Sequence, residues 1–311
     1  MFKFTDFIIY LYDGDSMIRT QLNLFSDKIK KGQQTKSTII RQSSSNNLKE
    51  SDPIVGYIGN NFSTSDRKYY AGMTDGDGNL KEMSGPKFTF GLTLRHDHAE
   101  PILKLAEIFD LTISKLIYLI PRGKAQPTLT ITISGIKAKL FLFSIYPYLL
   151  EKKEKARAIL ISLGCPEKYL QDERQFSFEY LAGYTDAEGR IHFKLSHQQQ
   201  RRGRAKQLKT YSTYQMHYEL INNDNAHLQF LKKNLIDLGF DHFRKDYIDT
   251  YKYLPAHKQI RNKPTTHILL GGAPDQLSKF YKNIEPFILI KHKKDKMLAT
   301  MKYSDIITMN K

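Results

Sequence analysis

The segment YAGMTDGDG at residues 70–78 recurs as LAGYTDAEG at residues 181–189. In the first copy Gly72 and Gly76 stand four positions apart, the second copy has small residues at both matching positions, and glycine ends each copy. Positions four apart share one face of a helix, and glycine commonly follows the last helical turn. The repeat therefore predicts two similar halves, each beginning with a helix that has a stripe of small residues on one face.

Asp77 and Glu188 occupy matching places in the two copies, about 110 residues apart, which is the length of one small domain. Small residues let two helix backbones approach closely, as they do in membrane helices. If the two stripes pack about a two-fold axis, the helix ends and both acids meet. Adjacent carboxylates repel each other, and a hard divalent cation with oxygen ligands is their natural partner. The repeat thus predicts that Asp77 and Glu188 bind a divalent metal.

These segments resemble the motif helices of LAGLIDADG homing endonucleases, in the single-chain form with two motifs. The resemblance extends more loosely from about residue 65 to the C-terminus. The first copy departs from the motif, with Tyr70 in place of Leu and Thr74 in place of a hydrophobic residue. The resemblance implies a monomer that cuts long double-stranded DNA sites, with acids at the ends of the two motif helices holding divalent metals.

Hydrophobic alternation and periodicity predict an α+β protein of two pseudo-symmetric αββαββα halves. The halves span residues 65–164 and 165–311, after an N-terminal extension and polar linker at 1–64. Strands are expected at 87–94, 128–134, 190–196, 213–220, 240–250 and 265–270, and helices at 99–109, 135–146, 153–163, 226–238, 274–284 and 291–309. The resemblance implies that the sheets form a DNA-binding saddle, and a two-stranded ribbon fits the major groove.

The composition favours a polyanionic partner, because the net charge is +16. Cys165 is the single cysteine, which excludes a disulfide within the chain and a cysteine-rich zinc site. No apolar run is long enough for a transmembrane helix, so no membrane partner is expected. The chain is rich in Lys, Ile, Asn and Tyr and lacks Trp, a bias typical of AT-rich organellar genes. We therefore expect a mitochondrial or chloroplast protein.

A second repeat, residues 146–152 matched with 285–291, precedes the last expected helix of each half. The resemblance implies an active-site lysine here, near the scissile phosphate, which indicates Lys152 and Lys291. The neighbouring Lys153 and Lys293 leave the choice open, and a solvated basic helix start is the alternative.

The resemblance also implies polar residues that hold the attacking water, and Arg95 and Asn222 match this place at the ends of two strands. The following acids, Asp97 and Asp224, are good helix N-caps. Backbone carbonyls of Gly76 and Ala187 are expected to complete the metal shell. The expected cofactor is Mg²⁺ or Mn²⁺.

Asp75 and Asp186 repeat as well. An acid near a helix C-terminus opposes the helix dipole, so another group must compensate for its charge. The resemblance implies that these residues support the helix interface, and a direct metal role is the alternative.

Strand parity, counted from the two motif acids, predicts the residues that contact DNA. They are Lys81, Met83, Lys87 and Thr89 in the first half, and Arg190, His192, Lys194, Ser196, Gln215 and His217 in the second. Arg201, Arg202 and Arg204 lie in a charged hairpin tip, which is predicted to bind DNA phosphates and so to position the protein without reading the base sequence. A solvated charged loop is the alternative for this tip.

The function predicted from these features is a site-specific DNA endonuclease of intron homing, acting by metal-dependent phosphodiester hydrolysis at a long asymmetric target. The first alternative is an RNA maturase that binds its host intron RNA and assists splicing. The second is a non-catalytic DNA-binding regulator on the same scaffold. Both acids are present, and this favours the endonuclease.

Overall fold

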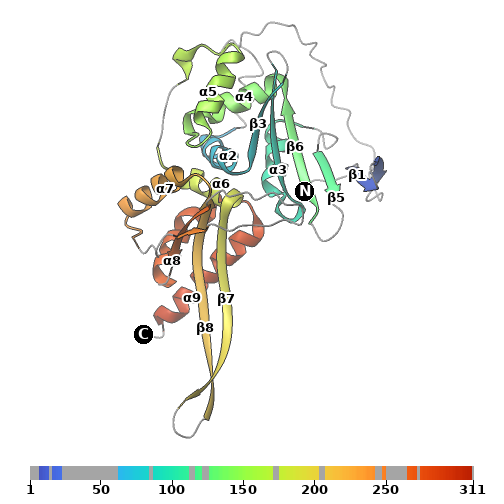
Figure 1. The fold of residues 1–311 in the computed structure, drawn as a ribbon. Coiled ribbons are helices and arrows are strands. Elements are labelled where there is room, and N and C mark those ends of the chain that lie inside the picture. The colour runs from blue at the N-terminus through green and yellow to red at the C-terminus, as the bar shows by residue number, and fades with distance from the viewer. Residues whose placement is uncertain are drawn as a thin grey trace, which may run out of the picture. The chain divides into compact units, whose positions relative to one another are not determined.

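The computed structural model describes residues 7–13, 16–22, 62–83, 87–111, 116–120, 126–170, 175–202, 207–241, 247–249, 265–271 and 274–309. The described chain combines α-helices with largely antiparallel sheets, which confirms the predicted α+β class (Figure 1). Its contacts define two compact units, which are interleaved along the sequence. Unit 1 takes the described residues of 1–64, 78–147 and 153–172, and unit 2 those of 65–77, 148–152 and 173–311.

Unit 1 is built on a six-stranded sheet with the strand order β2-β1-β5-β6-β4-β3. The strands are β1 (Phe7–Asp13), β2 (Ser16–Leu22), β3 (Gly78–Met83), β4 (Lys87–Arg95), β5 (Leu116–Ile120) and β6 (Thr128–Ser134). The helices are α3 (Glu100–Ile108), α4 (Gly135–Ile145) and α5 (Lys153–Ser162), with 3₁₀ turns at η1 (His96–His98), η3 (Tyr146–Tyr148) and η4 (Glu167–Tyr169). All three α-helices contact strands of this sheet.

Strand β4 has one buried and one open face, as its sequence pattern predicts. Phe88, Phe90 and Leu92 are buried, and Phe90 packs on Phe141 of α4 with ring centroids 4.3 Å apart. The alternate residues face away from the helices, and Thr93 shares a 2.8 Å side-chain hydrogen bond with its cross-strand neighbour on β6. The helix-covered face therefore forms the core of unit 1, and the other face is polar.

The N-terminal residues differ from the prediction. Strand β1 pairs in parallel with β5, and β2 pairs with β1, so 7–13 and 16–22 extend the sheet of unit 1. Phe62, which the sequence analysis placed in the linker, is fully buried and stacks with Phe141. The pairing has a physical reason, because β5 would otherwise be an edge strand with unpaired backbone groups. The rest of the predicted linker, residues 23–61, lies outside the described residues.

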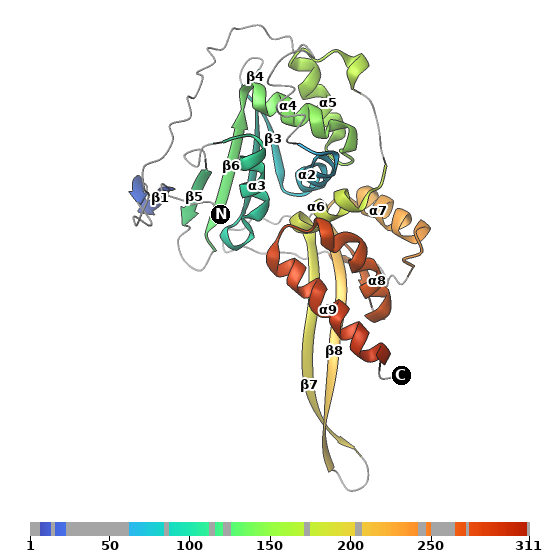
Figure 2. The same cartoon turned by 180° about the vertical axis from the view of Figure 1, so that it is seen from behind.

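Unit 2 contains a four-stranded antiparallel sheet with the order β7-β8-β10-β9. Its strands are β7 (Gly189–Arg202), β8 (Gln207–Asn222), β9 (Tyr247–Asp249) and β10 (Thr265–Gly271). Its helices are α6 (Phe178–Glu188), α7 (Asn225–Asp237), α8 (Pro274–Ile284) and α9 (Lys291–Met309), together with residues 65–76 of α2 (Thr64–Gly76) and the turn η5 (Glu285–Phe287). Helices α8 and α9 cover one face of the β7–β8 hairpin (Figure 2).

The long hairpin confirms the predicted pair of strands and is longer than expected. Strands β7 and β8 pair from Gly189 opposite Leu220 to Arg202 opposite Gln207. Within the predicted strand at 240–250, Tyr247–Asp249 form strand β9, and 242–246 and 250 lie outside the described residues. Among the described residues, no helix combines the length and apolar character needed to span a bilayer.

Within unit 2, helices α2 and α6 pack with their backbones in direct contact at the small residues of the repeat. A Cβ atom added at Gly72 would collide with the backbone oxygen of Tyr180, and one added at Gly183 would collide with the backbone oxygen of Tyr69. A Cβ at Gly76 would collide with the side chain of Ala187. The contacts are reciprocal between the two copies of the repeat. The structure therefore confirms that the small-residue stripes pack against each other.

We expect Gly183→Val to unfold the α2–α6 pair, because the new side chain meets backbone atoms that cannot rotate away. The free energy of unfolding should fall by about 3 kcal/mol or more, the upper part of the overpacking range. The measurement is denaturant unfolding of the full chain. Gly91→Ala is the matched control, since its Cβ would meet atoms only at ordinary contact distances of 3.9 and 4.0 Å. Equal stability losses in both variants would contradict the assigned backbone contact.

Candidate active site

Asp77 and Glu188 lie next to each other in unit 2, at the ends of the paired helices. Glu188 is the last residue of α6, and Asp77 follows the last residue of α2 and donates its backbone N–H to the Met73 carbonyl at 3.0 Å. The position of a Cβ on Gly76 lies 3.2 Å from Cγ of Glu188. The close approach of the helices therefore brings the two predicted acids together.

The electrostatics of the acids reflect this proximity. Burial raises the pKa of the Asp77 carboxyl, and the charges of Lys293 and Lys152 oppose that rise. Burial also raises the pKa of the Glu188 carboxyl, and the neighbouring charge of Asp77 raises it further. Two carboxylates that share a partly desolvated place gain from a bound cation, because it offsets both their repulsion and their desolvation. The pair is thus suited to a divalent ion.

Two lysine side chains cap the ends of the motif helices. Lys152 donates from Nζ to the carbonyls of Thr74 at 2.7 Å and Gly76 at 2.9 Å. Lys293 donates to the carbonyls of Thr185 at 2.7 Å and Asp186 at 2.8 Å. Cations at helix C-termini satisfy carbonyls that have no partner within the helix. The two halves therefore place one ammonium group each beside the acids.

The structure brings Lys293, and not the predicted Lys291, to this place. Lys291 is exposed, whereas Lys293 is buried. The reason lies in the helix starts: α9 begins at Lys291, while α5 begins only after Lys152, at Lys153. Lys293 therefore sits in the first turn of its helix, two positions beyond the residue that aligns with Lys152. Lys153 bonds instead to the Pro147 carbonyl, at 3.2 Å.

Asp75 and Asp186 cross-link the two motif helices. The Tyr69 hydroxyl of α2 donates to Asp186 at 2.8 Å, and the Tyr180 hydroxyl of α6 donates to Asp75 at 2.7 Å. Both aspartates are buried, so these bonds are formed away from solvent. The crossed pairs support the expected role of these acids at the helix interface.

Each of these aspartates also holds the turn before the last helix. Asp75 accepts from the backbone N–H groups of Leu150 at 2.7 Å and Lys152 at 2.8 Å, and Asp186 accepts from Leu289 at 2.8 Å. Both carboxylates thus accept several donors of the protein, which supports a role at the helix interface, although Oδ1 of Asp186 accepts no hydrogen bond from the described residues. They fix the segments from which Lys152 and Lys293 reach the helix ends.

The two predicted water-holding residues have different surroundings. In unit 2, Asn222 donates from Nδ2 to Glu151 at 2.8 Å and to the Tyr184 hydroxyl. In unit 1, Arg95 is exposed and forms a two-pronged ion pair with Asp97, at 2.6 and 3.0 Å. Asp224 accepts from the His227 backbone N–H at 3.1 Å and so caps α7 as expected.

Tyr69, Tyr180 and Glu151 also belong to this site and were not predicted from the sequence, and Lys293 was named only as an alternative to Lys291. A signal for the tyrosines was present, because each directly precedes one copy of the repeat and extends the match by one position. Glu151 and Lys293 have no equivalent at the aligned position in the other half. Their roles depend on where the last helices begin.

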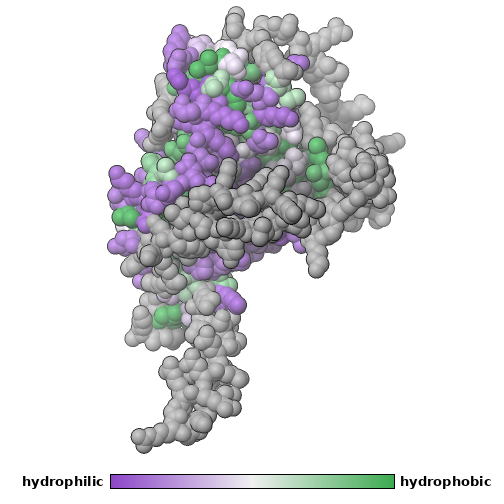
Figure 3. Space-filling model, viewed as in Figure 1, coloured by the Kyte–Doolittle hydropathy of each residue, from purple (hydrophilic) through white to green (hydrophobic). Residues whose placement is uncertain are grey.

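The predicted DNA-contact residues of unit 1 share one sheet face. Lys81 pairs with Thr89 and Met83 pairs with Lys87 across β3 and β4, and this face lies opposite the buried one. Hydrophilic residues, purple in Figure 3, predominate over hydrophobic ones on the coloured surface seen there.

In unit 2, Arg190, His192 and Lys194 alternate with the buried Ile191, and His192 lies directly opposite His217. The side chains of Ser196, Arg201, Arg202 and Gln215, and all of Arg204, lie outside what the structure describes.

No protein-family model matches the chain, and no curated protein matches it in sequence. The structure is similar to solved LAGLIDADG proteins. The meganuclease I-CpaMI bound to uncleaved DNA is 12% identical with a TM-score of 0.48, over 78% of this chain and 92% of that one. The meganuclease I-AabMI bound to uncleaved DNA is 14% identical with a TM-score of 0.45, over the same shares. The homing endonuclease I-GzeII in complex with its DNA target is 11% identical with a TM-score of 0.45, over 78% and 91%.

Glu151 should make stability depend on pH. Burial raises the pKa of its carboxyl to about 7, against the charge of Lys152 and with a contribution from Asp75. Between its ordinary value of 4.5 and 7, the folded state therefore binds more protons than the unfolded state, and stability falls as pH rises.

Glu151→Gln removes this dependence. The stability of the wild-type chain relative to the variant should fall between pH 4.5 and 7 and stay level above that range. Urea unfolding of both proteins across this range measures the difference. A difference that does not change with pH would contradict the assigned environment of Glu151.

Proposed function

We propose that this protein is a metal-dependent, site-specific DNA endonuclease of the LAGLIDADG homing type. The observation that supports it most is the adjacent pair Asp77 and Glu188 at the ends of two helices joined through glycine, with one lysine beside each helix end. Acids at unrelated helix ends would not be expected to lie beside each other and beside two ammonium groups that bond to the carbonyls of those same helix ends.

The donor set fits Mg²⁺ or Mn²⁺. Asp77 and Glu188 offer carboxylate oxygens, which these ions prefer, and no thiolate lies among the residues of the site. Those two acids would hold the ion. The Gly76 carbonyl, which was predicted to bind the metal, accepts a hydrogen bond from the Lys152 ammonium instead. The Ala187 carbonyl stays a predicted ligand. When bound, the ion would generate hydroxide from water and neutralise charge on the phosphate.

The lysines supply fixed positive charge next to that place. Burial lowers the pKa of Lys152, and burial lowers the pKa of Lys293 to about 8, with Asp186, Asp77 and Glu188 opposing the change. Lys293 is therefore mainly charged at neutral pH. An ammonium group held by two carbonyls needs little reorganisation to stabilise negative charge that develops on a phosphate oxygen.

Nucleic acid would lie against the open sheet faces. In unit 1 that face has Lys81 and Lys87, and in unit 2 it has Arg190 and Lys194, all exposed. Contacts between these basic side chains and the phosphates of the DNA backbone would supply affinity, and the polar residues between them would contact the bases. Intron homing, a monomeric state and an organellar location belong to the same proposal, supported by the two motifs in one chain and by composition.

Asp77→Asn and Glu188→Gln should each abolish double-strand cleavage while leaving affinity for DNA within about threefold, because affinity comes from many phosphate contacts. The substrate is the DNA formed by joining the flanks of the host intron, tested with Mg²⁺ and with EDTA. Full cleavage by either variant would remove that acid from the active site.

Faster splicing in the presence of the wild-type protein, with no DNA cleavage, would indicate the maturase instead. Splicing of the host intron RNA, with and without the protein, is the measurement.

Lys293→Met should lower the cleavage rate at least tenfold, since the ammonium beside the acids is lost. Lys291→Met is the matched control: it removes an exposed lysine two positions away in the same helix turn, and cleavage should stay within about twofold. Single-turnover cleavage at saturating protein separates the rate from affinity. The reverse ranking of the two variants would restore Lys291 to the active site.

A further inference from the structure

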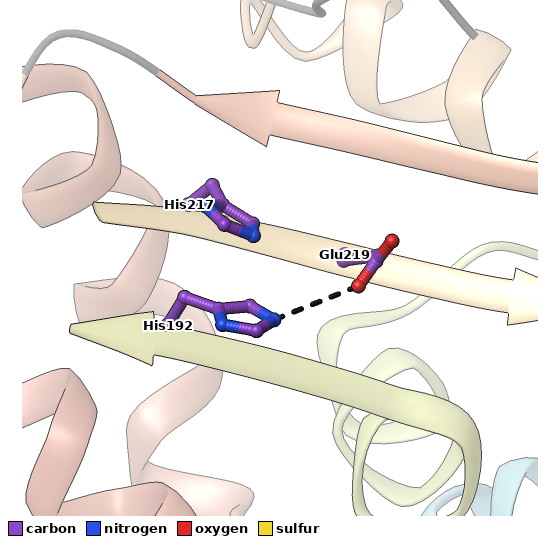
Figure 4. A group of neighbouring side chains, drawn as sticks. All are labelled: His192, His217 and Glu219. Carbon is purple, nitrogen blue, oxygen red and sulfur yellow. Dashed lines mark ion pairs between the residues drawn. The ribbon is translucent and has the colours of Figure 1, made fainter. Parts of the chain in front are cut away.

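His192, His217 and Glu219 form a cluster on the open face of the β7–β8 hairpin in unit 2 (Figure 4). One ligand atom from each lies within 4.8 Å of the other two. The cluster was not recognised in the sequence, because it depends on strand register: His192 lies opposite His217, and Glu219 follows two positions later on the same face. It uses none of the residues of the candidate active site.

The geometry of this group, which we call the His–His–Glu cluster, is close to that of a tetrahedral metal site. Nε2 of His192 lies 3.6 Å from a carboxylate oxygen of Glu219. Two ligands of a tetrahedral zinc ion, each about 2.0–2.2 Å from the metal, are about 3.4 Å apart. The rings of His192 and His217 stack with centroids 4.0 Å apart and planes at 23°. One pair of ligand atoms is thus near the tetrahedral spacing and all three lie within 4.8 Å of one another, so binding one ion requires the imidazoles to turn toward it.

Burial distinguishes this cluster from a chance surface group. The Glu219 side chain is only 6% exposed, whereas that of His192 is 44% exposed. A buried carboxylate is costly unless a cation or hydrogen bonds compensate it. The half-exposed imidazole of His192 makes the cluster accessible to an ion from solvent.

We propose that the His–His–Glu cluster binds a borderline divalent ion of the Zn²⁺ class, with three protein ligands and one water. Imidazole nitrogen suits Zn²⁺, Co²⁺, Ni²⁺ and Cu²⁺, whereas Mg²⁺ and Ca²⁺ prefer oxygen ligands. The site is therefore chemically different from the acid pair Asp77 and Glu188. The competing explanation is a purely ionic group, in which Glu219 pairs with protonated His192 and with Arg190 opposite it in the register.

The test is Co²⁺ and Zn²⁺ binding to the full chain without DNA, purified without a histidine tag and stripped of metal. We expect one tightly bound equivalent and the intense visible absorption of four-coordinate Co²⁺, displaced by Zn²⁺ but not by excess Mg²⁺. His192→Ala and Glu219→Gln should each weaken binding at least about tenfold and remove the band. Glu188→Gln should keep the band, which excludes the acid pair as its source.

His96→Ala is the matched control, because it removes an exposed histidine from unit 1 and should leave Co²⁺ binding unchanged. Circular dichroism and thermal unfolding show whether each variant is folded, and His192→Gln replaces His192→Ala if the latter is not. The proposal is overturned if the wild-type chain gives no four-coordinate Co²⁺ band, or if the band survives in the folded His192 and Glu219 variants.

A consequence for DNA binding rests on the proposed function. Imidazole nitrogens that bind an ion cannot form hydrogen bonds with DNA bases. Zn²⁺ should therefore weaken DNA binding by the wild-type chain but not by the His192→Gln variant. The metal titration needs no DNA, so the two proposals are tested separately. A failed endonuclease assay would not contradict the metal site, and a failed titration would not contradict the endonuclease.

Discussion

The contact between the backbones of α2 and α6 is the constraint on which the rest of the site depends. Gly72 and Gly183 let each helix lie against a carbonyl of the other, where any side chain would intervene. This approach brings the two helix ends together, and with them Asp77 and Glu188. The acids thus owe their proximity to glycines one turn or more away, and not to any attraction between the acids, which repel each other.

The crossed bonds from Tyr69 to Asp186 and from Tyr180 to Asp75 join this contact to the lysines. Each aspartate receives one hydroxyl from the opposite helix and backbone N–H groups from the turn before a last helix. Each carboxylate therefore fixes both the spacing of the two helices and the backbone segment from which a lysine side chain extends.

Much of this arrangement could be predicted from sequence, because it follows from local patterns. Alternation located β4 and β6, and the repeat identified the acids and the packed stripes. The sequence left the choice between Lys291 and Lys293 open, because aligning two segments does not show where α9 starts, and that start decides which side chain reaches the helix end. Glu219 was missed because its neighbours are set by strand register, and the pairing of Tyr69 with Asp186 because it joins residues far apart in sequence.

The division of the chain into units has a consequence for taking the protein apart. Unit 2 contains 65–77 and 148–152 besides the C-terminal residues from 173 onward. A fragment that begins near residue 173 has α6 without α2, and its glycine face is left without the surface that covers it. A cut between the repeats leaves unit 1 whole in the N-terminal fragment, whereas unit 2 regains 65–77 and 148–152 only when the two fragments associate. The protein is thus suited to fragment complementation, in which the reassembly of two inactive pieces restores the paired acids.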